Sequence, residues 1–205
     1  IYVLRHGETE WNRVGRCQGH LDAPLTDLGR EQAAMQGRIL REQVLARHPS
    51  VRVLISPLGR TRATWQIAAE AAGLPDHPAE IEQRLIEVNM GSWQGRLRDE
   101  ALAEDAEARS LPNLFEISLA TPEGEDFDTL SARLKALLAT VSGPTICVTH
   151  GITSLMLRGL VRGLTRAEMA GQGLQGGKAF PAAMMCRRRR TAEAKSIRDR
   201  RELIA

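Results

Sequence analysis

Three residues near the start of the chain, an arginine, a histidine and a glycine, have the types and spacing that suit phosphoryl chemistry. A short apolar run at positions 1–4 predicts a buried strand, and Arg5, His6 and Gly7 follow it directly. Open α/β sheets bind their ligands at the carboxyl ends of the strands. A guanidinium, an imidazole and a glycine that allows close backbone approach could bind phosphate oxygens there.

Two further predicted strands end in residues of the same kind. The apolar run at 51–55 leads into Ser56 and then Arg60, and the run at 145–149 ends at His150 and Gly151. Neighbouring parallel strands end at the same edge of a sheet. We therefore expect the three groups to converge on one cleft.

Metal binding is an alternative use of the first histidine, because His6 and Glu8 form an H-x-E pair. No further ligand stands at a helical or hairpin spacing that would complete such a site. We therefore expect no metal ion.

The elements that must position these groups alternate between strand and helix. The expected helices cover about 27–48, 58–72, 98–109, 125–141 and 151–163. A weak strand is expected within 79–88, and a loop or short helix at 111–123. This alternation predicts an α/β fold, a three-layer α/β/α arrangement with a mostly parallel central sheet.

Length and cysteine usage place the chain in a broad class. A length of 205 residues fits one domain with a substantial core. No apolar run is long enough to span a bilayer, and we expect no secretory leader, because the first predicted strand lacks a charged segment and a cleavage site. The cysteines, Cys17, Cys147 and Cys186, form no C-x-x-C pair. We expect reduced thiols, a cytoplasmic location and no membrane partner.

Basic residues concentrate at the end of the chain. From residue 178 onward there are nine Lys or Arg and three Asp or Glu, whereas the residues before it hold 19 and 22. One alternative function is therefore a nucleic-acid-binding module that uses the run 187–190. This run has no interleaved aromatic residues, so nucleic acid is not an expected partner.

Seven motifs, in order, resemble those of the histidine phosphatase superfamily, also called the phosphoglycerate mutase-like family. They are RHGETEWN at 5–12, GRCQG at 15–19, PLTDLG at 24–29, SPLGRTRAT at 56–64, LIEVNMGSWQG at 85–95, PEGED at 122–126 and VTHG at 148–151. Together they extend over most of the first 160 residues. The resemblance implies a phosphoglycerate mutase-like fold.

The resemblance also implies a set of catalytic residues. His6 matches the nucleophile that becomes phosphohistidine, and Arg5 matches a contact of the phosphoryl oxygens. Arg60 matches the arginine of the S-x-L-x-R turn, Glu87 the acid/base carboxylate and His150 the second pocket histidine. Taken singly, these last three are equally consistent with a helix-start cation, a solvated loop acid and a strand-end histidine.

Four residues are the expected substrate contacts, Asn12, Gln18, Gly19 and Gly151. By the resemblance, Asn12 matches a phosphate-contacting position, and Gln18 and Gly19 match positions that line the substrate mouth. Arg62, two residues after the arginine of the S-x-L-x-R turn, is expected to face elsewhere on its helix.

Phosphoryl transfer explains why these residue types are needed. The transferred group carries negative charge on three oxygens, so positioned cationic and amide donors provide most of the stabilisation. We expect nearby guanidinium groups to lower the pKa of His6, and its second nitrogen to donate to a backbone carbonyl. Glu87 would protonate the leaving alkoxide and then activate water, without a metal or cofactor. His20 and Asp22 are expected to be loop residues outside this chemistry.

The choice between hydrolase and mutase depends on a second anion clamp. Mutases of the family carry a Tyr, a Lys and an adjacent Arg pair after the acid/base segment. Between positions 91 and 133 this chain has no Lys or Tyr, and Arg96, Arg98 and Arg109 are not adjacent. We therefore expect a phosphomonoester hydrolase acting on small phosphorylated metabolites. A cofactor-dependent phosphoglycerate mutase is the alternative. The sequence leaves the oligomeric state open, and a homodimer is one of the states it allows.

The end of the chain departs from the family pattern. We expect a histidine phosphatase catalytic domain at 1–177 and an atypical basic C-terminal tail at 178–205. Relatives usually finish with another alternating strand, whereas the tail shows no such period. We expect no tail strand in the main sheet, which would leave a sheet edge exposed, and a helix at about 191–204.

Overall fold

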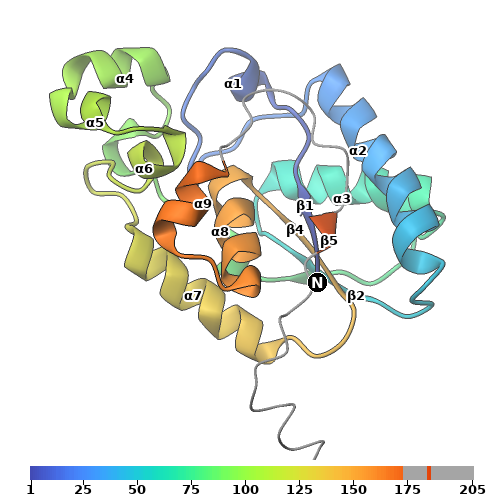
Figure 1. The fold of residues 1–205 in the computed structure, drawn as a ribbon. Helices are drawn as coiled ribbons and strands as arrows, with labels where there is room; N and C mark the ends of the chain where they lie inside the picture. Colours follow the sequence, from blue (N-terminus) through green and yellow to red (C-terminus); the bar gives the residue numbers. More distant parts are fainter. Residues whose placement is uncertain (173–183, 186–205) are drawn as a thin grey trace, which may run out of the picture.

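A five-stranded sheet forms the centre of the computed structural model, which describes residues 1–172 and 184–185. In spatial order the strands are β3 (Glu80–Ile81), β2 (Arg52–Ile55), β4 (Thr145–Thr149), β1 (Tyr2–Arg5) and β5 (Met184–Met185). The first four run parallel, and β5 pairs antiparallel with β1. The mostly parallel sheet of the expected fold is thus present (Figure 1).

The strand β5 corrects one expectation about the tail. Two residues of the segment after residue 177, Met184 and Met185, pair with Val3 and Tyr2 at the edge of the sheet. The absence of a hydrophobic period did not exclude this pairing, because ladder hydrogen bonds use backbone groups that every residue except proline carries. The helix expected at 191–204 lies outside the described residues.

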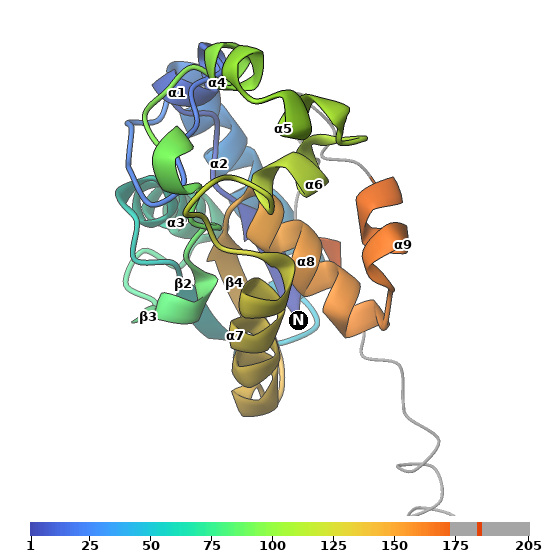
Figure 2. The same cartoon turned by 90° about the vertical axis from the view of Figure 1, so that its left-hand side faces the viewer.

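Helices cover both faces of the sheet, as Figures 1 and 2 show. One face carries α2 (Asp27–Ile39), the π-helical turns Leu40–Leu45 that continue it, and α3 (Gly59–Ala72). The other carries α7 (Phe127–Thr140) and α8 (Gly151–Arg162). The layers arise because alternate strand residues point to opposite faces: Leu4 packs on the α2–α3 side, whereas Val3 packs on the α7–α8 side.

The short helices group at one end of the molecule (Figure 2). They are α1 (Glu10–Arg13), α4 (Arg98–Glu104), α5 (Ala106–Ser110) and α6 (Leu114–Ser118), and a further short helix, α9 (Arg166–Gly171), follows α8. The continuous helix expected at 98–109 is wrong at Asp105, where α4 ends and α5 begins. The reason is capping, because the Asp105 carboxylate accepts a hydrogen bond from the Ala108 N–H at 2.8 Å.

The segment 82–97, which carries Glu87 and connects β3 to α4, contains little regular structure. The strand expected within 79–88 is confined to β3, and two short 3₁₀ turns follow at Gln83–Leu85 and Gly91–Trp93.

Among the described residues, none of the helices is long and apolar enough to cross a membrane.

Candidate active site

The three strand ends expected to meet do so at one edge of the sheet. Arg5 is in register with Thr149, and the His6 N–H donates to the Thr149 carbonyl at 3.0 Å. The Ser56 N–H likewise donates to the carbonyl of Val148 on the neighbouring strand at 3.0 Å. This register brings the His6 and His150 rings to a centroid separation of 5.2 Å.

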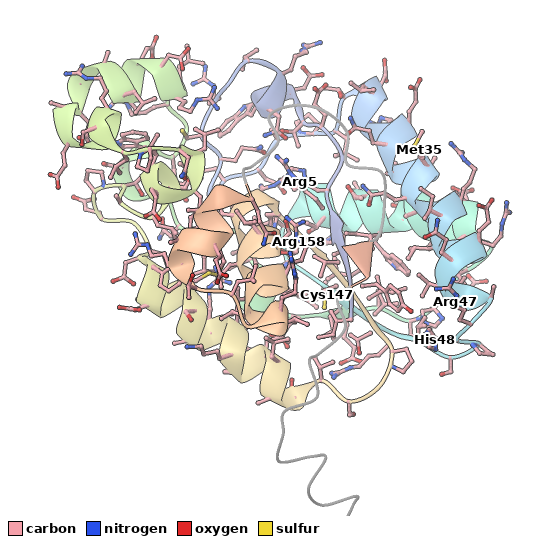
Figure 3. The ribbon with its side chains drawn as sticks, in the orientation of Figure 1. Arg5, Met35, Arg47, His48, Cys147 and Arg158 are labelled. Carbon is pink, nitrogen blue, oxygen red and sulfur yellow. The ribbon has the colours of Figure 1, made fainter. Side chains whose placement is uncertain are left out.

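Arg5 extends from the end of β1 to the first turn of α8 (Figure 3). Its Cζ lies 3.5 Å from the position that a β-carbon on Gly151 would occupy, so the guanidinium lies directly beside the backbone of this residue. A cation beside the first residue of a helix adds to the positive end of the helix dipole. Arg5 and Gly151 together therefore suit an anion.

The tautomer of His6 is fixed by its backbone. Its Nδ1 lies 2.7 Å from the Gly7 carbonyl oxygen, which can only accept, so Nδ1 carries the proton and Nε2 keeps its lone pair. Burial lowers the pKa of His6 well below its usual value, and the positive charges of Arg60 and Arg5 lower it further. Both expectations about this ring are confirmed, although burial has the larger effect on its pKa.

Helix α2 holds the loop that carries His6 through a close glycine contact. A β-carbon on Gly7 would lie 2.1 Å from the Gly29 carbonyl oxygen, and one on Gly29 would lie 2.0 Å from the carbonyl oxygen of Glu8. Neither position tolerates a side chain without a backbone shift. The Gly7 N–H also donates to Thr64 Oγ1 of α3 at 3.1 Å, so both helices on this face of the sheet fix the loop.

Adding one methyl group at this contact should therefore damage both stability and activity. We expect Gly29→Ala to lower the free energy of unfolding by about 1–3 kcal/mol, because the backbones must separate, and to slow turnover as the loop at 5–8 moves. Urea unfolding and steady-state kinetics measure the two effects. Gly171→Ala is the matched control, because none of the residues that the structure describes lies within 4 Å of its β-carbon position. Unchanged stability of Gly29→Ala would contradict this account.

His150 is fully buried and both of its ring nitrogens have partners. Arg60 Nε lies 3.1 Å from Nδ1 and can only donate, so Nδ1 is unprotonated. In the neutral ring Nε2 then carries the proton and donates to Ser56 Oγ at 2.6 Å. Burial, followed by the charge of Arg60, lowers the pKa of His150 well below its usual value. Sequence reasoning placed Ser56 at the strand end but did not identify it as the partner of this ring.

The two neutral imidazoles predict that acid destabilises the fold. The pKa values of His6 and His150 lie below the ordinary value of 6.5 that both regain on unfolding. Between the folded and unfolded values the unfolded chain binds more protons, so their contribution to stability is complete above about pH 6.5 and is lost as pH falls toward the folded values. The slope approaches about 1.4 kcal/mol per pH unit for each imidazole.

Urea unfolding at about pH 7.5 and about pH 5 tests this dependence. The variant His6→Asn lacks one of the two titrating groups and should show a shallower loss of stability than the wild type. The same slope in both proteins would mean that His6 does not titrate abnormally.

Arg60 connects His150 to the loop that precedes α2. Its side chain is buried and donates to the carbonyl oxygens of Leu21 at 2.6 Å and Gly19 at 2.9 Å, in addition to His150. It also contacts Asp22 Oδ1 at 3.1 Å. These contacts occupy four of its five N–H groups, so within residues 1–172 one N–H on Nη2 is left for a ligand.

Asp22 and His20 lie in a loop as expected, but both contact the site. The Asp22 carboxylate accepts from the backbone N–H groups of Gly59 and Arg60 at the start of α3. His20 Nε2 donates to the carbonyl oxygen of Glu87 at 3.0 Å. The expectation that they stand outside the site is therefore wrong. The sequence held one signal that α3 needs a capping group from elsewhere in the chain. This helix begins after Leu58, whose side chain cannot accept a hydrogen bond from the first N–H groups.

The Glu87 carboxylate lies at the N-terminus of α8. Oε1 accepts from the Thr153 N–H at 3.0 Å, the Thr153 hydroxyl at 2.9 Å and the Val88 N–H at 3.0 Å. Oε2 accepts from the Ile152 N–H at 3.2 Å. These donors and the helix dipole stabilise the carboxylate anion. Oε2 retains a lone pair for proton transfer.

The remaining expected contacts differ in their surroundings. Asn12 is exposed and caps α1, where its Oδ1 accepts from the Thr9 N–H at 3.2 Å. Gln18 is buried, and within the described part of the chain its Oε1 has no hydrogen-bond partner. Gly19 has a φ of +52°, a backbone conformation that strains residues with a side chain, and its β-carbon position lies 2.2 Å from Gln94 Oε1.

Two alternatives from the sequence can be placed in the fold. Glu8, the second residue of the H-x-E pair, accepts a hydrogen bond from Thr26 Oγ1 at 2.9 Å. Across residues 1–172, no group of three or more His, Cys, Asp or Glu is arranged to hold a metal ion. Arg62 is exposed, whereas Arg60 on the same helix is buried.

This constellation matches a known family. The sequence matches the family described as histidine phosphatase superfamily (branch 1) over residues 1–181. A probable phosphoglycerate mutase of Photorhabdus laumondii is 32% identical over 169 residues, which are 80% of this chain and 75% of that protein.

Solved structures give the same result. A structure of mycobacterial glucosyl-3-phosphoglycerate phosphatase with VO3 has a TM-score of 0.68 and 28% identity, covering 83% of this chain and 85% of that one. Mycobacterial hydrolase 1 has a TM-score of 0.70 and 28% identity, covering 84% and 85%. The chain belongs to the histidine phosphatase superfamily, and its fold is phosphoglycerate mutase-like.

Proposed function

We propose that this protein hydrolyses phosphate monoesters of small metabolites through a phosphohistidine on His6. The observation that carries the proposal is the state of that ring. Its Nδ1 proton is held by the Gly7 carbonyl and its pKa is lowered, so Nε2 presents an unprotonated lone pair beside the buried charge of Arg60. A neutral imidazole nitrogen next to guanidinium groups is what nucleophilic attack on a phosphoryl group requires.

In the first half-reaction, Nε2 of His6 attacks phosphorus and the bond to the ester oxygen breaks. Arg5, the remaining N–H of Arg60 and the backbone of Gly151 at the start of α8 would stabilise the negative charge on the transferred oxygens. Glu87 gives a proton to the leaving alkoxide, which departs as an alcohol, and the carboxyl group regains a proton from water in the second half-reaction.

In the second half-reaction, the Glu87 carboxylate takes a proton from a water molecule. The water oxygen attacks phosphorus, the bond between nitrogen and phosphorus breaks, and inorganic phosphate leaves. His6 returns to its neutral tautomer because Nδ1 keeps its proton, which stays hydrogen-bonded to the Gly7 carbonyl oxygen throughout. Among the substrate contacts we include Gln18, because its buried Oε1, which has no partner among the described residues, can accept a hydrogen bond from a substrate hydroxyl.

A phosphoglycerate mutase is the second candidate, because a relative at 32% identity is named as one. The arginines after the acid/base segment favour hydrolysis instead. Arg96 pairs with Glu104 at 2.7 Å, and Arg109 donates to the Ala103 carbonyl oxygen at 2.5 Å. With these groups engaged, and no Lys or Tyr between positions 91 and 133, a second acidic group of a bisphosphate would lack its clamp.

The test is a phosphate-release screen over sugar phosphates, nucleotides and phosphoglycerates, with EDTA present and His6→Asn as the control. Release that continues in EDTA and stops in the variant supports the proposal. Interconversion of 3- and 2-phosphoglycerate faster than phosphate release would favour the mutase. Release that needs an added metal ion would refute the mechanism.

We also propose a cytoplasmic location. Cys17 and Cys147 are both buried and unpaired, and burial raises the pKa of the Cys147 thiol to about 12. Thiols in this state suit a reducing compartment. The run 187–190, on which a nucleic-acid-binding function would depend, lies outside the described residues.

A further inference from the structure

The segment that carries Glu87 has few backbone hydrogen bonds of its own. It runs between the 3₁₀ turns at 83–85 and 91–93 and belongs to no strand or helix. A carboxylate on such a segment stays in place only if its backbone is held from outside. The side chain bonds to α8 described above are one support, and the backbone carbonyls of the segment need others.

Arg133 of α7 provides that support. Its Nη1 donates to the Arg84 carbonyl oxygen at 2.6 Å, and its Nη2 lies 3.2 Å from the carbonyl oxygen of Glu87. One guanidinium therefore binds both the beginning of the segment and the proton-transferring residue itself. The carbonyl oxygen of Glu87 also accepts from His20 Nε2, so it is fixed from two sides.

Glu125 orients the guanidinium. Its carboxylate binds Arg133 in a bidentate manner, with Oε1 at 2.6 Å from Nε and Oε2 at 2.8 Å from Nη2. The Glu125 N–H donates to the Asn89 carbonyl oxygen at 2.8 Å, which holds the far end of the segment. Side-chain exposures of 17% for Arg133 and 10% for Glu125 keep water from competing for these bonds.

We propose that Arg133, oriented by Glu125, is a positioning residue that places Glu87 for proton transfer. The inference rests on the proposed function. It gives the PEGED motif, of which Glu125 is the fourth residue, a role in orienting Arg133. A lysine at position 133 keeps the charge but has no planar fork, so it cannot hold Glu125 and two carbonyl oxygens together. A misplacement of about 1 Å at a reacting group can slow a reaction by about 100-fold.

Esters with different leaving groups distinguish a positioning role of Arg133 from general damage to the active site. Departure of p-nitrophenolate needs little protonation, whereas departure of an alkoxide such as that of glycerol phosphate requires the proton of Glu87. The measurement is the single-turnover rate of phosphoenzyme formation with each ester. For Arg133→Lys we expect a loss of about 10- to 100-fold with glycerol phosphate and less than about 3-fold with p-nitrophenyl phosphate. Glu125→Gln should shift the ratio in the same direction.

The exposed pair Arg52 and Glu80 is the matched control. It is also bidentate, with contacts of 2.9 and 2.6 Å, but it joins β2 to β3 and touches neither Glu87 nor its segment. Arg52→Lys should leave both rates unchanged. The double variant Arg133→Lys with Glu125→Gln should lose little more than either single one, because the two residues act as a unit.

Several results would overturn the inference. If Arg133→Lys slows both esters equally, the pair supports the fold in general and does not position the carboxylate. If it slows neither, the carbonyl contacts are dispensable. Failure of the proposed function is seen separately, because then no phosphoenzyme forms in the wild type or His6→Asn remains active.

Discussion

Replacing His6 with asparagine is expected to abolish turnover, with a loss of about 10⁴-fold or more in kcat. The reason is that Nε2 of this ring is the nucleophile in the first half-reaction and carries the phosphoryl group until water displaces it in the second, and His150, the other buried imidazole beside it, has no nitrogen to replace it. The two nitrogens of His150 are engaged with Arg60 and Ser56. Asparagine keeps a polar group that can bond to the Gly7 carbonyl, so the loop should remain in place.

Two measurements check this expectation. Phosphate release gives the rate, and acid quenching after mixing with a radiolabelled ester should trap an acid-labile, alkali-stable phosphoenzyme only in the wild type. His48→Asn is the control, because His48 packs on Tyr2 at the start of β1 while Arg5 ends the same strand (Figure 3). A phosphoenzyme in the His6 variant, or activity near the wild-type level, would contradict the proposed nucleophile.

Replacing Glu87 with glutamine is expected to slow turnover of alkyl phosphates by about 10²- to 10⁴-fold. The amide can neither protonate the leaving alkoxide nor take a proton from water. Phosphoenzyme formation from p-nitrophenyl phosphate should continue, whereas its hydrolysis should nearly stop. The expected result is a burst of one p-nitrophenolate per active site, followed by slow release.

Stability must be measured beside these rates. The glutamine NH₂ group cannot accept from the N–H groups of α8 that now bind the carboxylate, which should cost about 1–3 kcal/mol of unfolding free energy. Glu107→Gln, at an exposed position of α5, controls for the loss of one negative charge. Fast steady-state hydrolysis of alkyl phosphates by the Glu87 variant would assign proton transfer to another group.

Local patterns in the sequence predicted the strands and their ends. The apolar runs before His6, Ser56 and His150 form β1, β2 and β4. A strand that is apolar on both sides is buried from water in a sheet with helices on both faces. The helix expected at about 125–141 is likewise present as α7, with Leu130 and Leu134 buried. Such predictions succeed because hydrophobic periodicity is local information.

Contacts between distant residues could not be predicted in this way. Asp22 caps α3 from 37 residues away, and Arg133 binds the carbonyl oxygen of Glu87 from a helix on another layer. Neither residue type is unusual in its own neighbourhood. The break at Asp105 was predictable in principle, because aspartate favours the first position of a helix, but the same residue is also tolerated inside one.

By itself the sequence determined the layered fold, the three strand ends and the types of groups that meet there, since hydrophobic burial and parallel pairing leave few other arrangements. Only the tertiary structure decided which atoms are free to react. It engaged both nitrogens of His150, left Nε2 of His6 open and placed Glu87 against the N-terminus of α8. Hydrogen-bond partners depend on distances of a few tenths of an ångström between segments far apart in the chain, and packing sets these distances.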